Sequence, residues 1–308
     1  MSYLGIDCGS VSIKFALVTD GRLQEKIYLR NHGLIQTVKK GLGMLRTDGI
    51  RGVGVTGSGK EFVKSLVSAD YIDSEIISHL TATVNRYPDV RTVLDIGGED
   101  SKLMLVKDGA LTCFQMNRDC GGGTGAMIEA IANRLEVRLE DVGEMALGSR
   151  NAVDLPGKCG IFCQSAVVSE LNKGRPIPDI LMGVCRALVA NFLAVLAKGK
   201  ILAGPIVFQG ATAQNAALVR CFEEALNSPI LVPQDCSFMG AIGIAELTGE
   251  VMAGSPTSFR GIETILKNDH VTEISRCADC ENRCELLYLR SGQDILGISG
   301  SRCGKYNN

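Results

Sequence analysis

The sequence predicts an α/β protein made of two copies of one β-hairpin unit, followed by a small cysteine-rich C-terminal extension. Three observations support this fold class. Two stretches of the first half repeat each other at a constant offset of 88 residues. Glycine-rich turns lead directly into helical patterns around residues 117–135 and 205–225. Four cysteines stand close together after residue 276.

The internal repeat pairs residues 3–21 with residues 91–109. Each copy has a short apolar run ending near an aspartate, a glycine turn, a run that alternates like a strand, and an Asp-Gly hairpin turn. Nine or more positions agree without a gap, so we expect two copies of one hairpin unit, facing each other across a cleft. The matched positions are Asp7 with Asp95, Gly9 with Gly97, Lys14 with Lys102, Leu17-Val18 with Leu105-Val106, and Asp20-Gly21 with Asp108-Gly109.

In each copy an aspartate leaves the end of a buried strand and meets a glycine turn. Backbone N–H groups of such a turn can hold phosphate oxygens, and carboxylates can hold the water shell of Mg²⁺. Asp7 and Asp95 are therefore candidates for a site that binds phosphates and magnesium. The run Val53–Glu61 nearly fits a P-loop, but Glu61 stands where a magnesium-binding Ser or Thr is needed. We therefore do not assign a P-loop there.

Composition excludes several function classes. The net charge is −2, so there is no general electrostatic case for binding nucleic acid or an anionic membrane. No window reads as an uninterrupted transmembrane span, and the first seven residues do not resemble a signal peptide. We expect a cytoplasmic protein. Twelve cysteines in a cytoplasmic chain favour metal or redox chemistry over a disulfide framework.

Two cysteines stand at expected helix starts. Cys120 lies in the run Asn117–Gly125, just before a helical pattern, and Cys159 precedes a second one. A helix N-terminus favours a thiolate and also favours phosphate. Two thiolates are too few for a tetrahedral metal or an iron–sulfur cluster, but a symmetric dimer would supply two more. Cys163 could reach the same face, although burial as a small apolar residue fits it better. The alternative is a glycine turn with an incidental cysteine.

The second half carries two further features. A strand over 205–209 leads into a glycine turn at Gly210 and a helix, a corner typical of nucleotide sites. Residues 251–270 look like a linker, and residues 271–308 form a tail with Cys277, Cys280, Cys284 and Cys303. Such spacing indicates a metal site, with iron–sulfur favoured over zinc; free surface thiols are the alternative. We thus expect a nucleotide domain over 1–250, with a first lobe over about 1–90 and the repeat restarting near 92.

The motifs together identify a family. They are LGIDCGSVSIK, VTGSGK, DIGGEDSK, NRDCGGGTGAMIEAIANRLEV, CGIFCQSAVVSELNKG and FQGATAQN, and they span residues 3 to about 250. The chain resembles the ATP-dependent activators of 2-hydroxyacyl-CoA dehydratases and the related ATPase subunits of benzoyl-CoA reductase. This resemblance implies the actin/Hsp70/sugar-kinase fold, with duplicated ribonuclease-H-like lobes around an ATP cleft. It also implies a homodimer that shares one [4Fe-4S] cluster.

The resemblance assigns roles to individual residues. Cys120 and Cys159 fall on cluster ligands, Asp7 and Asp95 on the phosphate and Mg²⁺ carboxylates, and Gly210 on the adenosine corner. The remaining expected cofactor-binding residues lie in or beside the glycine turns: Gly9, Ser10, Lys14, Gly97, Gly98, Gly123, Thr124, Ala211, Gln214 and Asn215. The corner here reads Gly-Ala-Thr-Ala-Gln-Asn where the family has Gly-Gly-Val-Ala-Gln-Asn. The tail resembles the cysteine segment of larger fused activase-like proteins.

The expected function is therefore an ATPase that drives a low-potential electron to a partner iron–sulfur dehydratase or reductase. Reduced ferredoxin or flavodoxin would be the electron donor. The tail over residues 271–308 would hold a second metal site, either an iron–sulfur cluster or a zinc ion. Two other classes stay open at this point: a small-molecule kinase of the same fold, and a non-catalytic iron–sulfur or zinc scaffold. Basal ATP hydrolysis without an acceptor distinguishes the activator from both.

Overall fold

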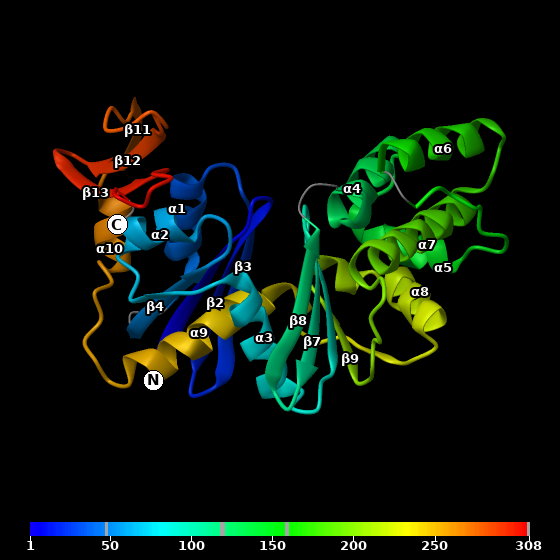
Figure 1. Cartoon of the computed structure of the whole chain (residues 1–308), viewed down its shortest axis with the longest axis horizontal. Coiled ribbons are helices and arrows are strands. Elements are labelled where there is room, and N and C mark those ends of the chain that lie inside the picture. The colour runs from blue at the N-terminus through cyan, green and yellow to red at the C-terminus, as the bar shows by residue number, and fades with distance from the viewer. Residues whose placement is uncertain (47–48, 118–120, 158–159, 307–308) are drawn as a thin grey trace. The chain divides into compact units, whose positions relative to one another are not determined.

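The computed structural model describes residues 1–46, 49–117, 121–157 and 160–306 (Figure 1). Contacts divide the chain into two compact units. Unit 1 is formed by Met1–Ala82 together with Phe238–Asn308, and unit 2 by Thr83–Ser237. Each unit has a five-stranded mixed sheet covered by helices, so the α/β prediction is confirmed.

The sheet of unit 1 has the strand order β3-β2-β1-β4-β5. The first three strands form an antiparallel meander, and β4 and β5 extend it in parallel. Asp20 and Gly21 both have positive φ, 49° and 74°, as the two-residue turn of a tight hairpin requires. The strands are β1 (Ser2–Cys8), β2 (Ser12–Thr19), β3 (Arg22–Arg30), β4 (Ile50–Thr56) and β5 (Tyr71–Ile72).

The sheet of unit 2 repeats this topology with the order β10-β9-β6-β7-β8. Asp108 and Gly109 again have positive φ, 52° and 76°. The pairing register shifts between Leu105 and Val106, as it does between Leu17 and Val18 in unit 1. The predicted duplication is therefore confirmed, including the position at which the pairing register shifts. The strands are β6 (Thr92–Ile96), β7 (Ser101–Lys107), β8 (Ala110–Asn117), β9 (Ile206–Gln209) and β10 (Ile230–Leu231).

Helices cover both faces of the unit 1 sheet (Figure 1). On one face α1 (Leu34–Met44) and α2 (Lys60–Val67) close a core that includes Phe15, Leu42 and Leu66. On the other face α9 (Met239–Met252) lies very close to the strands, and at Gly5 there is no room for a side chain beneath it. A Cβ on Gly5 would stand 1.8 Å from the Ala241 carbonyl oxygen.

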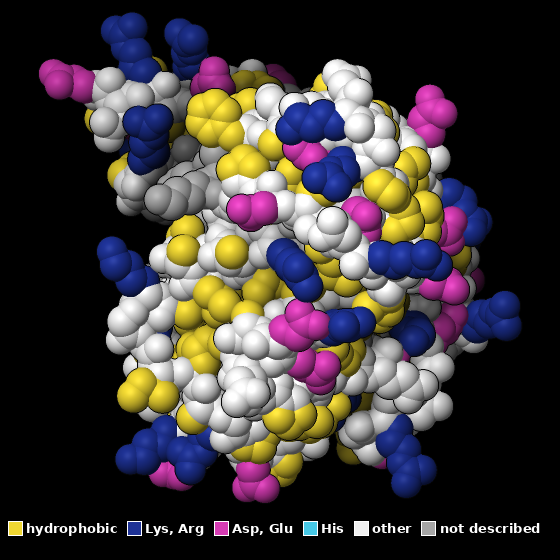
Figure 2. All heavy atoms as spheres, turned by 90° about the vertical axis from the view of Figure 1, so that its right-hand side faces the viewer, with side chains coloured by type: hydrophobic (Ala, Val, Ile, Leu, Met, Phe, Trp, Pro, Cys, Tyr) yellow, Lys and Arg dark blue, Asp and Glu magenta, His cyan; other side chains and the backbone are white. Residues whose placement is uncertain are grey.

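The second unit builds its core from α4 (Gly125–Arg134), α5 (Val142–Leu147), α6 (Gly160–Asn172), α7 (Ile177–Leu196) and α8 (Ala216–Leu226). Short 3₁₀ turns cover Gly121–Gly123, Leu139–Asp141, Ala211–Gln214 and Cys236–Phe238. Helix α3 (Glu75–Arg86) begins in unit 1 and ends in unit 2. Figure 2 shows Lys, Arg, Asp and Glu side chains interspersed over one face of the molecule, with no broad area of one sign.

Helix α7 is the one helix among the described residues that is long and apolar enough to cross a membrane by length and composition, although Asp179 and Arg186 interrupt its apolar sequence. However, 72% of that window is buried inside the protein, where Leu188 and Phe192 pack in the unit 2 core. A core helix of this kind meets the same criterion because most of its surface is apolar and buried.

The C-terminal segment packs on α2 of unit 1. Residues 257–260 reach α2 first: Arg260 Nη1 donates to the carbonyl oxygens of Ser65 and Leu66, at 2.9 and 3.1 Å. Then α10 (Ile262–Lys267) leads into a three-stranded antiparallel sheet of β11 (Val271–Arg276), β12 (Glu285–Ser291) and β13 (Asp294–Ser299). Leu289 joins the core beside α2, and a Cβ on Gly297 would meet Ser65 Oγ at 2.2 Å.

Candidate functional site

The first repeat places Asp7 and Lys14 side by side. They are register partners at the end of the β1–β2 hairpin, and Lys14 Nζ lies 3.2 Å from Asp7 Oδ2. Asp7 is 4% exposed, so this carboxylate is buried with its cation. The turn that follows closes with a bond from Gly9 N–H to the Ser12 carbonyl oxygen, 3.1 Å.

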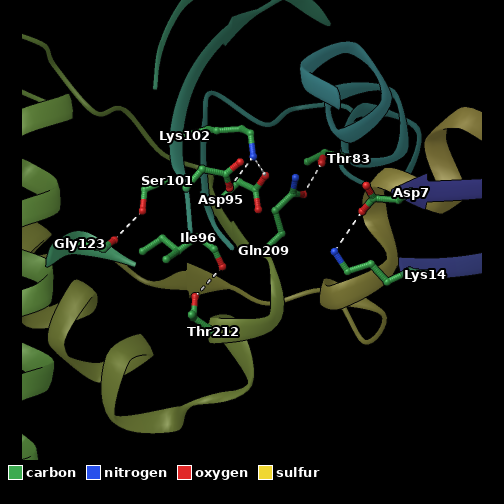
Figure 3. Close-up of polar contacts among 11 residues, drawn as sticks. Asp7, Lys14, Thr83, Asp95, Ile96, Ser101, Lys102, Gly123, Gln209 and Thr212 are labelled. Carbon is green, nitrogen blue, oxygen red and sulfur yellow. Dashed lines mark hydrogen bonds and ion pairs between the residues drawn. The ribbon is translucent and has the colours of Figure 1, made fainter. Parts of the chain in front are cut away.

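The second repeat does the same with Asp95 and Lys102. They are register partners in β6–β7, and Lys102 Nζ lies 3.6 Å from Asp95 Oδ2 (Figure 3). Both side chains are almost fully buried. Gly97 N–H donates to the Asp100 carbonyl oxygen at 2.9 Å, the counterpart of the bond in the first turn. Two buried carboxylates, each followed by a glycine turn, suit the binding of phosphates and magnesium.

A second glycine corner stands against each aspartate. Asp7 is in register with Thr56 on β4, and Gly57 follows; Asp95 is in register with Gln209 on β9, and Gly210 follows. Gly57 and Gly210 have φ of 90° and 88°. A Cβ on Gly57 would lie 2.8 Å from Asp7 Oδ1, and one on Gly210 would lie 2.7 Å from Asp95 Oδ1. The near-P-loop run and the predicted adenosine corner are thus equivalent parts of the two units.

These corners are also tied to the aspartate strands by hydrogen bonds. Ser58 Oγ and Gly59 N–H both donate to the Cys8 carbonyl oxygen, at 3.3 and 3.0 Å. Thr212 Oγ1 donates to the Ile96 carbonyl oxygen at 2.9 Å (Figure 3). Each aspartate is therefore held between its own turn and a second, glycine-led corner.

The sequence analysis missed two residues beside Asp7. Gly240, in the first turn of α9, has no room for a side chain: a Cβ there would lie 3.0 Å from Asp7 Oδ2 and 2.7 Å from His79 Nε2. His79 is buried. The small-residue pattern of the α9 segment was the only sequence signal for this close approach.

The glycine-rich segment that carries the first candidate cluster cysteine is bonded to the Asp95 turn. Gly125 N–H donates to the Gly97 carbonyl oxygen at 2.9 Å, and Ala126 N–H to the Gly98 carbonyl oxygen at 2.8 Å. Ser101 Oγ donates to the Gly123 carbonyl oxygen at 2.5 Å (Figure 3). The start of α4 is therefore held by hydrogen bonds to the turn that follows Asp95.

The two cysteine-bearing segments also meet. Cys120 and Cys159 themselves lie outside the described residues, but their neighbours Gly122 and Gly160 are in contact. A Cβ on Gly160 would stand 3.1 Å from Gly122 Cα. Helix α6 begins at Gly160, directly after Cys159 as expected, whereas α4 begins at Gly125, after the 3₁₀ turn Gly121–Gly123. Cys163 is fully buried, which agrees with its interpretation as an apolar residue.

The rest of the predicted adenosine corner is well ordered by internal bonds. Gln214 Nε2 donates to Ser237 Oγ at 3.1 Å. The Asn215 side-chain oxygen accepts from Ala217 N–H and Leu218 N–H, so this carboxamide caps α8. Nucleotide contacts by these residues and by Ala211 stay a prediction.

The tail cysteines are near one another in the chain but not gathered. Cys277 N–H donates to the Cys284 carbonyl oxygen at 2.9 Å, which closes the loop between β11 and β12. Cys284 is buried, whereas Cys280 and Cys303 are exposed. In the described part of the chain no three His, Cys, Asp or Glu side chains are placed to hold a metal ion. The tail metal site therefore stays a prediction.

Comparison with known proteins decides the family. The model of the BadF/BadG/BcrA/BcrD ATPase family matches residues 4–248. The chain belongs to this ATPase family. It is 32% identical over 250 residues to the (R)-2-hydroxyglutaryl-CoA dehydratase activating ATPase of Acidaminococcus fermentans, covering 79% of this chain and 95% of that protein. It is 30% identical over 258 residues to the 2-hydroxyisocaproyl-CoA dehydratase activator of Clostridioides difficile, covering 80% and 94%.

A solved structure supports the same assignment. The activator of the 2-hydroxyisocaproyl-CoA dehydratase from Clostridium difficile, with bound ADPNP, has a TM-score of 0.76 and 27% identity, covering 83% of this chain and 97% of that one. The predicted family, the actin-like nucleotide fold and the ATPase class are confirmed. The matches cover about four fifths of this chain, and the family model ends before the tail.

Proposed function

We propose that this ATPase is an activator that uses ATP to drive an electron from a [4Fe-4S] cluster to a partner iron–sulfur enzyme. One observation supports the proposal: helix α4 lies between the turn after Asp95 and the segment that contains Cys120, and is bonded to the first of these. Its first residues donate hydrogen bonds to Gly97 and Gly98 in the Asp95 turn, and its N-terminal side leads back within five residues to Cys120. A change in the phosphate turn would act directly on the cysteine segment.

The nucleotide part of the proposal rests on the paired aspartates. Asp7 and Asp95 would position Mg²⁺ and the attacking water, while the glycine turns would present the backbone N–H groups of Ser10 and Gly98 to phosphate oxygens. Gly9 and Gly97 would serve by closing these turns through their own N–H groups. Carboxylates and bridging waters are the ligands that Mg²⁺ prefers, so these residues fit the ion. Catalysis of this type depends mainly on positioning and on stabilisation of charge. The proposed cofactor-binding roles of Lys14, Gly123 and Thr124 are secondary to these.

The cluster part rests on the glycines beside the cysteines. Because Gly122 lies beside Gly160, we propose that the cysteine preceding each of these glycines supplies one ligand to the same cluster. Two ligands from one chain leave two to be supplied, so we propose a homodimer with the cluster shared across its axis. Ile161 and Phe162, which directly follow this segment, are 74% and 67% exposed. Such exposed apolar side chains favour burial by a second copy. When bound, the cluster supplies a one-electron carrier.

The coupling step follows from α4. ATP binding or hydrolysis at the Asp95 turn would shift Gly97 and Gly98, and their hydrogen bonds would carry the shift to Gly125 and Ala126. The segments that hold Cys120 and Cys159 would move with them, which changes hydrogen bonding and solvent access around the thiolates. Both properties set the reduction potential of an iron–sulfur site.

The names of the relatives suggest the partners. They are activators of 2-hydroxyglutaryl-CoA and 2-hydroxyisocaproyl-CoA dehydratases, so we propose a 2-hydroxyacyl-CoA dehydratase or a related reductase as the acceptor. Reduced ferredoxin or flavodoxin is the proposed donor, in the cytoplasm. Cys277, Cys280, Cys284 and Cys303 are proposed to hold a second iron–sulfur cluster or a zinc ion. The domain division into 1–250, a linker over 251–270 and the tail over 271–308 stays part of this proposal.

The test is metal content and turnover on protein purified without oxygen. Iron and acid-labile sulfide per dimer, with EPR, are measured before and after Cys120→Ser. We expect a loss of about four irons per dimer, with the tail metal retained. Asp7→Asn and Asp95→Asn should keep that iron and lose ATP hydrolysis. Unchanged iron after Cys120→Ser would remove this ligand, and an absolute need for a phosphoryl acceptor would favour a kinase.

A further inference from the structure

A small cavity lies in the C-terminal segment of unit 1, between α10 and the β12–β13 hairpin, orange and red in Figure 1. Its volume is about 200 Å³. Pockets for organic ligands usually measure about 300–1,000 Å³, so this cavity suits a small ion. None of its lining residues has a role in the proposed nucleotide or metal sites. The polar residues that line it are Arg260, Thr264, Asn268, His270, Ser291 and Asp294.

Arg260 brings a positive charge to this cavity. Its Nη1 donates to the carbonyl oxygens of Ser65 and Leu66, at 2.9 and 3.1 Å. The other nitrogens of the guanidinium, Nε and Nη2, donate to none of the described residues. Burial lowers the pKa of Arg260, so solvent satisfies this charge only in part. Arginine carries five N–H donors in a planar fork that matches an oxyanion, and a fork with two nitrogens unused suits one.

His270 contributes a second unsatisfied group. Its Nδ1 is buried and has no hydrogen-bond partner among the described residues. A buried polar atom of this kind usually marks the place of a water or an ion. Burial lowers the pKa of His270, and the nearby charges of Lys39 and Arg260 lower it further. An anion in the cavity would oppose both effects and favour the protonated imidazole.

The other charged groups that face His270 come from three places. Lys39 of α1 reaches this region through its Nζ, which donates to the Asn268 carbonyl oxygen at 2.8 Å. Asp269 precedes His270 and raises its pKa more weakly than the cations lower it. Asp294 of β13 is the one carboxylate among the described lining residues. Asp294 is exposed, so solvent and salt screen its repulsion of an anion.

We propose that this cavity binds one small oxyanion of the phosphate or sulfate type, held by the guanidinium of Arg260 and the protonated imidazole of His270. Thr264 and Ser291 also line the cavity, and their hydroxyl groups can donate to further oxygens. Binding takes up a proton at His270, so the affinity rises as the pH falls towards the lowered pKa of the unliganded protein. The proposal does not depend on the ATPase or the cluster assignment, because its residues serve in neither.

The test follows the NMR signal of the His270 Cε1–H group in the full-length protein, labelled with ¹³C at histidine. The chain has three histidines, so His270→Gln assigns this signal. Sulfate is the probe because its charge stays constant near neutral pH, and chloride at equal ionic strength is the control. We expect sulfate to raise the pKa of His270. We also expect the affinity for sulfate to rise by up to about tenfold for each fall of one pH unit while the free imidazole is neutral.

Three variants assign the effect to the cavity, with calorimetry as the second readout. Arg260→Lys keeps a cation but loses the forked donors, so it should weaken sulfate binding about tenfold or more. Lys267→Gln removes an exposed cation from the same segment and should leave binding unchanged. His270→Gln should remove the pH dependence of binding. If Arg260→Lys does not fold, as urea unfolding would show, the calorimetric pH series of the parent and His270→Gln decides alone.

The signal of His79 separates this cavity from the nucleotide site, because His79 lies beside Asp7. A sulfate response of His79 without one of His270 would place the anion at the nucleotide site and overturn the proposal. Equal binding by Arg260→Lys and Lys267→Gln, or a sulfate affinity independent of pH in the parent, would also overturn it. Inorganic phosphate and glycerol phosphate are compared last, to distinguish a free ion from the phosphate group of an organic molecule. Binding of either supports the oxyanion site, and binding of neither refutes it.

Discussion

A methyl group at residue 210 would test the corner that holds the second aspartate. Gly210 has φ 88° and ψ 167°, a region that residues with a side chain rarely enter. A Cβ there would stand 2.3 Å from the Ile96 carbonyl oxygen and 2.7 Å from Asp95 Oδ1. The Ile96 backbone cannot yield without disturbing β6. The Asp95 carboxylate must therefore move, and with it the proposed magnesium and water geometry.

Two costs add in Gly210→Ala. The backbone conformation alone costs about 1–3 kcal/mol for a residue with a side chain. Forcing a methyl group into a filled space costs about 1–3 kcal/mol more. We therefore expect the free energy of unfolding to fall by about 2–6 kcal/mol. We expect ATP turnover of the folded variant to fall by about 100-fold, the loss that follows a misplacement near 1 Å.

The assay is urea unfolding together with steady-state ATP hydrolysis, with Gly199→Ala as the matched control. Gly199 also has positive φ, 72°, and lies in the same unit, but a Cβ there would meet nothing within 4 Å. The control therefore isolates backbone strain, about 1–2 kcal/mol, from the clash with Asp95. If the two variants have equal stability and equal turnover, the close approach of residue 210 to Asp95 is refuted.

Three more predictions concern the supporting structure. Arg260→Ala should lower the free energy of unfolding by about 1.5–3 kcal/mol, because two carbonyl oxygens at the end of α2 lose a charged donor; an unchanged urea midpoint would show that the linker does not hold α2. Hydrogen bonds from Ser149 Oγ and from backbone N–H groups lower the pKa of Asp179 in the folded protein. The ionised Asp179 therefore stabilises the fold fully above the ordinary aspartate pKa. This stabilisation is lost as the pH falls through the lowered pKa of the folded state. Asp179→Asn should thus reduce the urea midpoint at pH 7, with a smaller deficit at pH 3, and a deficit independent of pH would contradict this. Burial raises the pKa of Cys221 to about 11, so its thiol should resist iodoacetamide at pH 8 until urea unfolds the protein.

The repeat was predictable because its evidence is local in each copy. A hairpin carries its pattern in about twenty consecutive residues, and a constant offset preserves it. The same reasoning found helix starts near Gly125 and at Gly160, since glycine turns and helical periodicity are also local. His79 was not predictable in this way. Its approach to Asp7 depends on α3 and α9 packing over the sheet, which brings together positions 72 residues apart or more.

The comparison at an offset of 88 residues did not match Gly57 with Gly210, the glycines that begin the second corner in each unit. Gly57 and Gly210 have equivalent places beside Asp7 and Asp95, yet they are 153 residues apart instead of 88. The difference arises because α4 to α7 lie between β8 and β9, whereas α1 alone lies between β3 and β4. That insertion carries the segments of Cys120 and Cys159. The inserted elements α4 to α7 therefore have two effects. They change the offset between the two copies, so that a comparison at 88 residues misses the second half of the duplication. They also contain the segments with Cys120 and Cys159, which the first copy lacks. Because Gly125 and Ala126 of α4 donate hydrogen bonds to Gly97 and Gly98, the inserted helices are bonded to the turn after Asp95 and belong to the same compact unit.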